Sequence, residues 1–298
     1  MRIRWLGWAG VEVEESGERV VIDPLGDPAA VFAWLGERAA GMSVPAVVSP
    51  RPGAVAGLIT HLHRDHADAA ALAAALSADA TVYEPAGEAP PSGAADHPTK
   101  APPSGAADHP TKAPPSGAAD HPTVFGGNSG EQLGIAQADH ELTAAGITRR
   151  PAAPWASTAA GPFTLTALPA VDGTGDPQLS WLIEAGGTRV LHLGDTMFHG
   201  WWWRIRERFG APDVVLAPIN GARLTFPHRR PPSPLPGVMD PEQAALAAEL
   251  LRAERLVPIH YGGYELTGVY EPVPDALGRV TSASGRVTVI DPGQTIDL

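Results

Sequence analysis

Residues 60–66, Thr-His-Leu-His-Arg-Asp-His, constrain this chain more than any other stretch, because they hold four side chains that can bind a metal ion. The apolar run at residues 54–59 precedes them and predicts a buried strand. The Ala/Leu-rich run at residues 67–76 follows them and predicts a helix. The four candidate ligands therefore lie on one strand-to-helix turn.

The spacing of these side chains indicates parts of two metal sites. His61 and His63 are two residues apart, so their imidazoles point to the same side of an extended chain and can bind one ion. Asp65 and His66 lie where the chain turns into the predicted helix, and they can face a second ion. The chain contains no cysteine, so a borderline cation such as zinc would have imidazole and carboxylate ligands.

The HxHxDH pattern at residues 61–66 resembles the signature of the metallo-β-lactamase-fold hydrolase superfamily, in which a His, an Asp and a His usually follow as later ligands. Within that superfamily the chain is similar to the branch that contains L-ascorbate-6-phosphate lactonase and N-acyl phosphatidylethanolamine phospholipase D. The resemblance covers nearly the whole chain apart from one insertion. It implies an α/β fold, a four-layer αββα sandwich of two mixed β-sheets flanked by helices.

The resemblance also implies the later ligands. Asp195, in a Gly-Asp-Thr sequence after a predicted buried strand, is the expected carboxylate between the two ions, and His260 is the expected last histidine. The third position departs from the pattern, because the predicted strand at residues 163–168 leads to Asp172 instead of a histidine. We expect one ion to be bound by His61, His63 and Asp172, the other by Asp65, His66 and His260, with Asp195 between them.

Alternatives remain open around the third position. His199, four residues after Asp195, competes with Asp172 as a ligand, and it is also a candidate proton donor to the leaving group, as is Tyr261. His192 is expected to be a hydrogen-bonded core histidine. Zinc is the expected metal, and manganese or iron are alternatives that an oxygen-richer site favours.

Two divalent ions at this spacing predict hydrolytic chemistry. They would lower the pKa of a bridging water toward neutrality and polarise a scissile carbonyl or phosphoryl oxygen. Asp65 would accept a hydrogen bond from the resulting hydroxide. We expect an enzyme, a binuclear metal-dependent hydrolase that uses a metal-bound hydroxide on a small ester, lactone or phosphodiester. The alternative, motivated by the exchange at Asp172, is a metal-binding member of the fold without hydrolytic activity.

The rest of the chain predicts strands followed by α/β units, twice. Residues 2–8, 11–14 and 19–22 alternate polar and apolar side chains and predict an antiparallel meander. Asp23 follows as an expected hydrogen-bond acceptor beside the metal centre, or as a turn residue before Pro24. Further strands are predicted at residues 81–84, 163–168, 179–184, 188–193, 213–217 and 256–259, helices at 29–40, 129–146, 201–209 and 241–255, and an irregular link at 149–155.

One low-complexity segment interrupts this pattern. A twelve-residue sequence at 89–100 recurs at 101–112 and, without its final lysine, at 113–123. It offers no apolar face to bury and predicts a mobile loop, in which His97, His109 and His121 are not expected to bind metal. We expect a single domain over residues 1–298, with a repeat insertion at about 86–128.

Composition limits the partners. The formal charge of −12 disfavours a nucleic-acid surface. The N-terminal residues lack the apolar core of a signal peptide, and no run reaches the length of a membrane span. We expect a cytoplasmic protein that acts on a small-molecule substrate without nucleic acid or membrane insertion, and we leave homo-oligomer formation open. His228 or Arg229 is a candidate contact for an anionic substrate.

Overall fold

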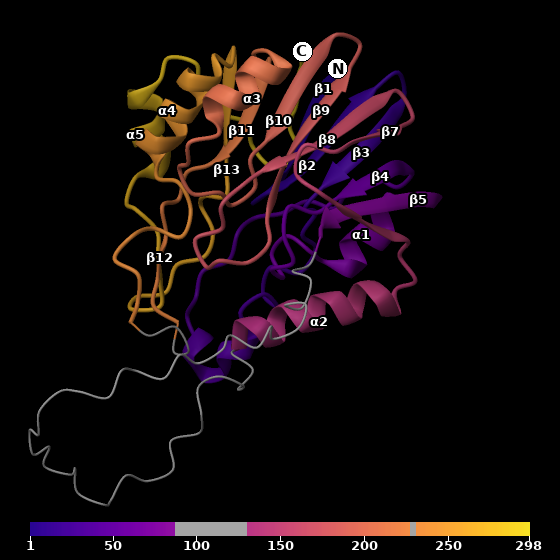
Figure 1. Cartoon of the computed structure of the whole chain (residues 1–298). Helices are drawn as coiled ribbons and strands as arrows, with labels where there is room; N and C mark the ends of the chain where they lie inside the picture. The colour runs from indigo at the N-terminus through magenta and orange to yellow at the C-terminus, as the bar shows by residue number, and fades with distance from the viewer. Residues whose placement is uncertain (87–129, 227–230) are drawn as a thin grey trace, which may run out of the picture.

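The computed structural model describes residues 1–86, 130–226 and 231–298. In these residues two β-sheets are stacked face to face, and helices cover the two outer faces (Figure 1). This is the four-layer αββα arrangement that the sequence predicts.

The first sheet has seven strands and contains the N-terminal meander. Strands β1, β2 and β3 pair antiparallel, and β3, β4, β5 and β6 continue the sheet in parallel. Strand β15 pairs with β1, so the two chain ends lie side by side (Figure 1). The order across the sheet is β15 (Thr295–Asp297), β1 (Arg2–Gly7), β2 (Gly10–Glu15), β3 (Glu18–Ile22), β4 (Ala54–Leu58), β5 (Leu76–Pro85) and β6 (Arg149–Ala152).

The second sheet has six strands and repeats this plan of antiparallel strands followed by parallel ones. Strands β7 to β10 pair antiparallel, and β10, β11 and β13 are parallel. A two-stranded sheet, β12 (Arg223–Leu224) with β14 (Tyr270–Glu271), lies apart from it. The order across the second sheet is β13 (Arg255–Ile259), β11 (Val214–Pro218), β10 (Thr188–His192), β9 (Leu179–Ala185), β8 (Phe163–Pro169) and β7 (Ser157–Ala160).

The apolar core lies in three layers that follow from this stacking. The inner faces of both sheets pack against each other through side chains such as Val11, Val13 and Trp181. The outer face of the first sheet packs against α1 (Ala69–Ala75) and α2 (Gly130–Ala144). The outer face of the second sheet packs against α3 (Trp202–Phe209), α4 (Pro241–Leu251) and α5 (Ala276–Ala283) (Figure 1).

Side chains at helix starts explain where two of these helices begin. Asp68 caps α1 by accepting a hydrogen bond from the backbone nitrogen of Ala71 at 3.0 Å. Asp240 and Gln243 form a capping box at α4, with Pro241 at the first helical position. The α1 cap fixes the point at which residues 60–66 pass from strand to helix.

Several local predictions are wrong. Residues 149–152 form strand β6 at the edge of the first sheet instead of an irregular link, because an edge strand tolerates Pro151. The helix predicted over residues 29–40 is a 3-10 segment, η1 (Ala33–Ala39), that is kinked at Gly36. The helix predicted over residues 241–255 ends at Leu251, because Arg252 adopts a left-handed conformation. Strands β7, β12, β14 and β15 and helix α5 were not predicted.

Two groups of expectations fall outside the described residues. These are the repeats with His97, His109 and His121, together with nearly all of the insertion expected at about 86–128, and the substrate contact expected from His228 or Arg229. Among the helices of the described ranges, none has the length and apolar composition that crossing a membrane requires.

Candidate metal centre

The seven predicted ligands lie on loops that follow strands of both sheets. Residues 61–66 follow β4 of the first sheet, whereas Asp172, Asp195 and His260 follow β8, β10 and β13 of the second. Their side chains form two groups, in each of which the ligand atoms lie within 4.8 Å of one another. One group is Asp65, His66, Asp195 and His260, and the other is His61, His63 and Asp172.

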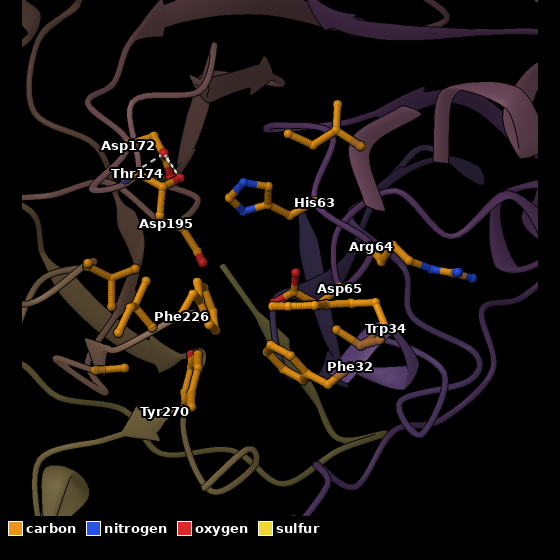
Figure 2. Close-up of a pocket in the computed structure, with 16 residues that line it drawn as sticks. Phe32, Trp34, His63, Arg64, Asp65, Asp172, Thr174, Asp195, Phe226 and Tyr270 are labelled. Atoms are coloured by element: carbon orange, nitrogen blue, oxygen red, sulfur yellow. Dashed lines mark hydrogen bonds between the residues drawn. The ribbon is translucent and has the colours of Figure 1, made fainter. Parts of the chain in front are cut away.

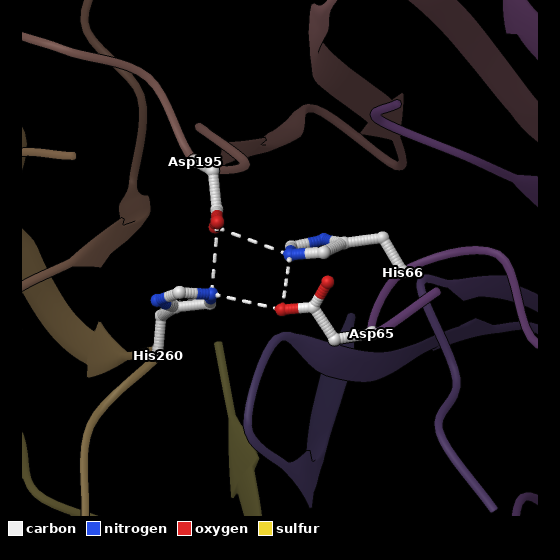
Figure 3. Close-up of side chains that lie close together, drawn as sticks. All are labelled: Asp65, His66, Asp195 and His260. Carbon is white, nitrogen blue, oxygen red and sulfur yellow. Dashed lines mark ion pairs between the residues drawn. The ribbon is translucent and has the colours of Figure 1, made fainter. Parts of the chain in front are cut away.

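The four-residue group surrounds a single point (Figure 3). His66 Nε2 lies 3.2 Å from Asp195 Oδ1 and 3.5 Å from Asp65 Oδ2. His260 Nε2 lies 2.9 Å from Asp195 Oδ2 and 3.5 Å from Asp65 Oδ2. Despite these distances, His66 Nε2, His260 Nε2 and Asp195 Oδ1 are buried without a well-formed hydrogen bond to any described residue. These three atoms point toward a common centre, as the ligand atoms of a bound cation do.

The charges of this group favour a cation at its centre. Burial alone would raise the pKa of Asp65 and of Asp195, but the imidazoles of His66 and His260 hold both values below the usual range. Burial alone would lower the pKa of His66, but the carboxylates of Asp195, Asp65 and Asp23 raise it well above its usual value. Two ionised carboxylates therefore face imidazole nitrogens that must carry a proton or contact a metal ion.

Asp23 determines which nitrogen of His66 faces the group. The buried carboxylate accepts a hydrogen bond from His66 Nδ1 at 2.7 Å, from the backbone nitrogen of Thr60 at 2.8 Å and from Thr60 Oγ1 at 2.5 Å. Since Nδ1 donates its proton to Asp23, Nε2 is the nitrogen of His66 that faces Asp195 and Asp65, where a metal ion can take the place of its second proton. The expected role of Asp23 as an acceptor beside the candidate centre is confirmed.

The three-residue group shows the same control of imidazole protons. Thr60 Oγ1 donates to Asp23 and so accepts from His61 Nδ1, 3.1 Å away, which leaves a lone pair on His61 Nε2. His63 Nε2 lies 3.0 Å from Asp176 Oδ2 and donates to it, which leaves a lone pair on His63 Nδ1. These two lone pairs face each other at 2.8 Å. Such an approach is repulsive unless a proton or a metal ion lies between the two nitrogens.

Burial favours the neutral form of His61, which is the form that metals bind. Burial lowers the pKa of His61 well below its usual value, and the neighbouring imidazoles of His66 and His63 lower it further. His61 therefore offers an unprotonated Nε2, the form that a metal ion binds.

Asp172 is held by its own turn. Its Oδ2 accepts hydrogen bonds from the backbone nitrogens of Thr174 at 2.8 Å and Asp176 at 3.0 Å, and from the hydroxyl of Thr174. A β-bridge between Asp172 and Thr196 joins this turn to the Asp195 loop. The turn thus carries both Asp172 and Asp176, the partner of His63.

Other contacts at the site escaped sequence reasoning. Trp8 donates from Nε1 to Asp65 Oδ2 at 2.9 Å, and its ring lies 3.8 Å from that of His260. The side-chain oxygen of Gln178, in the orientation that satisfies its neighbours, accepts from the backbone nitrogens of Asp195 at 2.8 Å and Thr196 at 2.9 Å. No local motif marks these residues, because their partners are far away in the sequence.

Three residues near the candidate ligands have a strained backbone conformation. Trp8, Asp23 and His260 have φ angles of 51°, 43° and 56°, a region that residues other than glycine rarely adopt. The backbone nitrogen of His260 donates to the carbonyl of Trp8 at 2.9 Å, and His260 Nδ1 lies 3.1 Å from Asn220 Nδ2. The surrounding contacts therefore hold His260 in a strained conformation that directs its ring into the group.

Neither of the two predicted proton donors belongs to a ligand group. His199 belongs to neither group, and its ring stacks on Trp202 with centroids 3.8 Å apart. Burial lowers the pKa of His199 to about 4, so it is neutral and a poor acid at neutral pH. Tyr261 stacks on Trp5 at 5.5 Å. Asp172, and not His199, completes the three-residue group. His192 is a buried histidine bonded to the carbonyl of Ala9 at 2.9 Å, as predicted.

The donor set of the two groups fits divalent metal ions. It consists of four imidazoles and three carboxylates, the ligands that zinc and other first-row divalent ions accept. In the described part of the chain, hydrogen bonds to Asp23, Thr60 and Asp176 determine which nitrogen of His66, His61 and His63 can bind a metal ion.

The two groups face a pocket with unlike walls (Figure 2). His63, Asp65, Asp172 and Asp195 lie on one side of it. Aromatic side chains lie opposite them. A ligand in this pocket would contact both the candidate metal ligands and an apolar surface.

Known proteins that resemble this chain include metal-dependent hydrolases and proteins of the same fold. Residues 129–261 match the Beta-lactamase superfamily domain. Over 131 residues the chain is 28% identical to a UPF0173 metal-dependent hydrolase of Thermococcus kodakarensis, in an alignment that covers 43% of this chain and 49% of the relative. The chain thus spans about half the length of the curated relatives that it matches.

Solved structures resemble the chain over nearly its whole length. A metallo hydrolase from the archaeon Ignicoccus hospitalis superposes with a TM-score of 0.56 at 21% identity and covers 99% of this chain and 97% of its own. A metallo-β-lactamase fold protein from Bacillus subtilis superposes with a TM-score of 0.57 at 16% identity and covers 99% and 98%. At these identities the likeness shows the fold.

Proposed function

Because this chain has the metallo-β-lactamase fold, we propose that it is a binuclear metal-dependent hydrolase of a small ester, lactone or phosphodiester. The observation that supports this most directly is the convergence of two ligand groups with inward lone pairs at one pocket. The name of the relative from Thermococcus kodakarensis points to the same chemistry.

We propose that one ion is bound by His61, His63 and Asp172, the other by Asp65, His66 and His260, and that Asp195 lies between them. Such ions, when bound, act as Lewis acids and lower the pKa of water. Zinc fits these ligands, and manganese or iron remain alternatives.

The chain's own residues would orient the reactants. Asp65, held by Trp8 Nε1 at 2.9 Å, lines the pocket and is placed to accept a hydrogen bond from an attacking water. Asp23 keeps the proton of His66 on Nδ1, and Asp176 does the same for Nε2 of His63. Neither His199 nor Tyr261 is among the described residues that line this pocket, so no contact there supports either as the proton donor.

Metal content and turnover together test the proposal. The protein should bind about two zinc or manganese ions per chain by elemental analysis, and it should turn over bis-p-nitrophenyl phosphate or a member of a lactone and ester panel. His61→Ala should lose one ion and at least about 100-fold in kcat, since it removes one of the proposed ligands of that ion.

His140→Ala serves as the control, because it changes an exposed histidine of α2 outside both groups. This variant should retain metal and activity. Two bound ions without turnover of any substrate would instead favour the alternative, a metal-binding protein of this fold that lacks hydrolytic activity.

A further inference from the structure

The pocket wall opposite the ligand groups is built from aromatic rings. Phe32, Trp34, Phe226 and Tyr270 line that side (Figure 2). Phe32 and Trp34 come from the segment before β4, whereas Phe226 and Tyr270 come from the region of β12 and β14. Two distant parts of the chain therefore meet to form one apolar surface.

These rings support one another before any ligand arrives. Phe32 meets Tyr270 edge to face, with centroids 5.6 Å apart, and lies 6.3 Å from Phe226. Trp34 meets Phe226 edge to face at 5.4 Å. Phe32, Phe226 and Tyr270 are buried, and Trp34 is partly exposed. Because the rings are already packed, binding an apolar group there requires little side-chain ordering.

The free space between the described residues suits a single ring. The cavity between these residues has a volume of about 80 Å³. A cavity that holds one water has roughly 10–15 Å³, so this one accommodates a group of several non-hydrogen atoms. A phenyl-sized group is compatible with this space.

We propose that the substrate carries a single aryl group, which lies on the wall of Phe32, Trp34, Phe226 and Tyr270 while its labile bond lies at Asp65 and Asp195. This inference rests on the proposed hydrolase function and narrows its substrate class. The aryl group gives affinity by burying apolar area. The ligand groups on the other side of the pocket would receive the polar, scissile part of the molecule.

Binding of two matched probes tests the inference without relying on turnover. Phenylphosphonate and methylphosphonate share one anionic head group and differ only in the apolar part. Titration calorimetry on the zinc-loaded protein should show phenylphosphonate binding at least tenfold tighter, or about 1.4 kcal/mol. Trp34→Ala should reduce this preference to about threefold or less, because Trp34 forms part of the wall without being fully buried.

Trp203→Ala provides the matched control, because Trp203 is 51% exposed on α3 and does not line the pocket. It should keep the full preference for phenylphosphonate. If Trp34→Ala does not fold, Phe226→Leu removes a ring from the same wall with a smaller loss of volume. It should lower the preference at least threefold.

The outcomes separate the two proposals. Equal binding of both phosphonates, no binding of phenylphosphonate to zinc-loaded protein, or an unchanged preference in the wall variants would overturn the aryl inference. Ester turnover with equal kcat/KM for phenyl and methyl substrates would do so while leaving the hydrolase intact. A clear phenyl preference without any turnover would support the aryl site and contradict hydrolysis.

Discussion

Asp23 is the residue whose replacement most directly tests how the centre is organised. Asp23→Asn preserves size and one oxygen, which can still accept from the backbone nitrogen of Thr60. The new amide group, however, replaces the oxygen that accepts from His66 Nδ1 at 2.7 Å and from the hydroxyl of Thr60 at 2.5 Å. His66 can avoid this clash of donors by moving its proton to Nε2, which places a proton on the nitrogen that faces Asp195.

The structure sets the size of both expected effects. Loss of an outer partner of a ligating histidine lowers metal affinity by about 10- to 100-fold. That range corresponds to about 1.4–2.7 kcal/mol. A buried donor left without an acceptor also costs about 1–3 kcal/mol of folding free energy, since Asp23 and His66 are both fully buried.

Two measurements separate these effects. Zinc affinity is measured by competition with a chromophoric chelator, and the free energy of unfolding of the metal-free protein by urea denaturation. Asp68→Ala is the control, because Asp68 also bonds to backbone nitrogens, those of Ala71 at 3.0 Å and Gly26 at 2.9 Å, but does not contact His66. It should lose about 1 kcal/mol of stability as a missing helix cap and keep its zinc affinity.

Zinc binding by Asp23→Asn within about twofold of the wild type, together with a fall in its stability, would contradict this role of Asp23. In that case Asp23 would support the fold without orienting His66. An equal loss of zinc affinity in Asp68→Ala would refute it as well, because the effect would then come from the stability of the loop.

Three further changes have expected outcomes of their own. Asp172→Asn keeps an oxygen that can accept the hydrogen bonds of its turn but removes the negative charge. Metal content should therefore fall from about two ions per chain toward one, with little change in the free energy of unfolding. An unchanged metal content would show that Asp172 is not a ligand. Burial lowers the pKa of His199 to about 4, whereas a histidine in the unfolded chain has a pKa of roughly 6.5, so protonation at acid pH favours the unfolded state. The wild type should therefore lose stability between pH 7 and pH 4.5, and His199→Phe should reduce that loss by about 2 kcal/mol in urea titrations. Identical pH profiles of the two proteins would contradict this. A Cβ atom at Gly263 would lie 2.5 Å from the ring of Trp8. Gly263→Ala should therefore lower the free energy of unfolding by about 1–3 kcal/mol and weaken zinc binding in the chelator assay. Gly285→Ala, with open space around it, should change neither quantity.

The part of the site that follows from the sequence is the part with a local pattern. His61, His63, Asp65 and His66 could be grouped in advance because their spacing on a strand-to-helix turn limits where their side chains can point. The packing layers were predictable for a similar reason, since apolar periodicity indicates which face of a strand is buried. Asp172 was found through its place after a strand, although nothing local distinguishes a ligand from a turn residue.

The partners that fix the imidazole protons carry no such pattern. Asp176 contacts His63 across 113 positions of sequence, and Trp8 contacts Asp65 across 57. Asn220 lies 40 positions from His260. Each contact depends on how loops meet in space, and an Asp, Trp or Asn at a strand end is equally common in an ordinary turn. Sequence reasoning therefore identifies candidate ligands more readily than the residues that orient them.

The site also depends on direct bonds between the two sheets. The backbone nitrogen of Leu179 donates to the carbonyl of Thr60 at 2.8 Å, and Trp181 Nε1 donates to the carbonyl of Ile59 at 3.0 Å. Both bonds run from β9 of the second sheet to the residues just before His61 of the first. Because this loop supplies four ligands and the second sheet supplies the other three, these bonds fix one half of the candidate centre against the other. Stacking of apolar faces alone allows the sheets to slide, whereas these buried, directional bonds determine the register in which the two ligand groups can form.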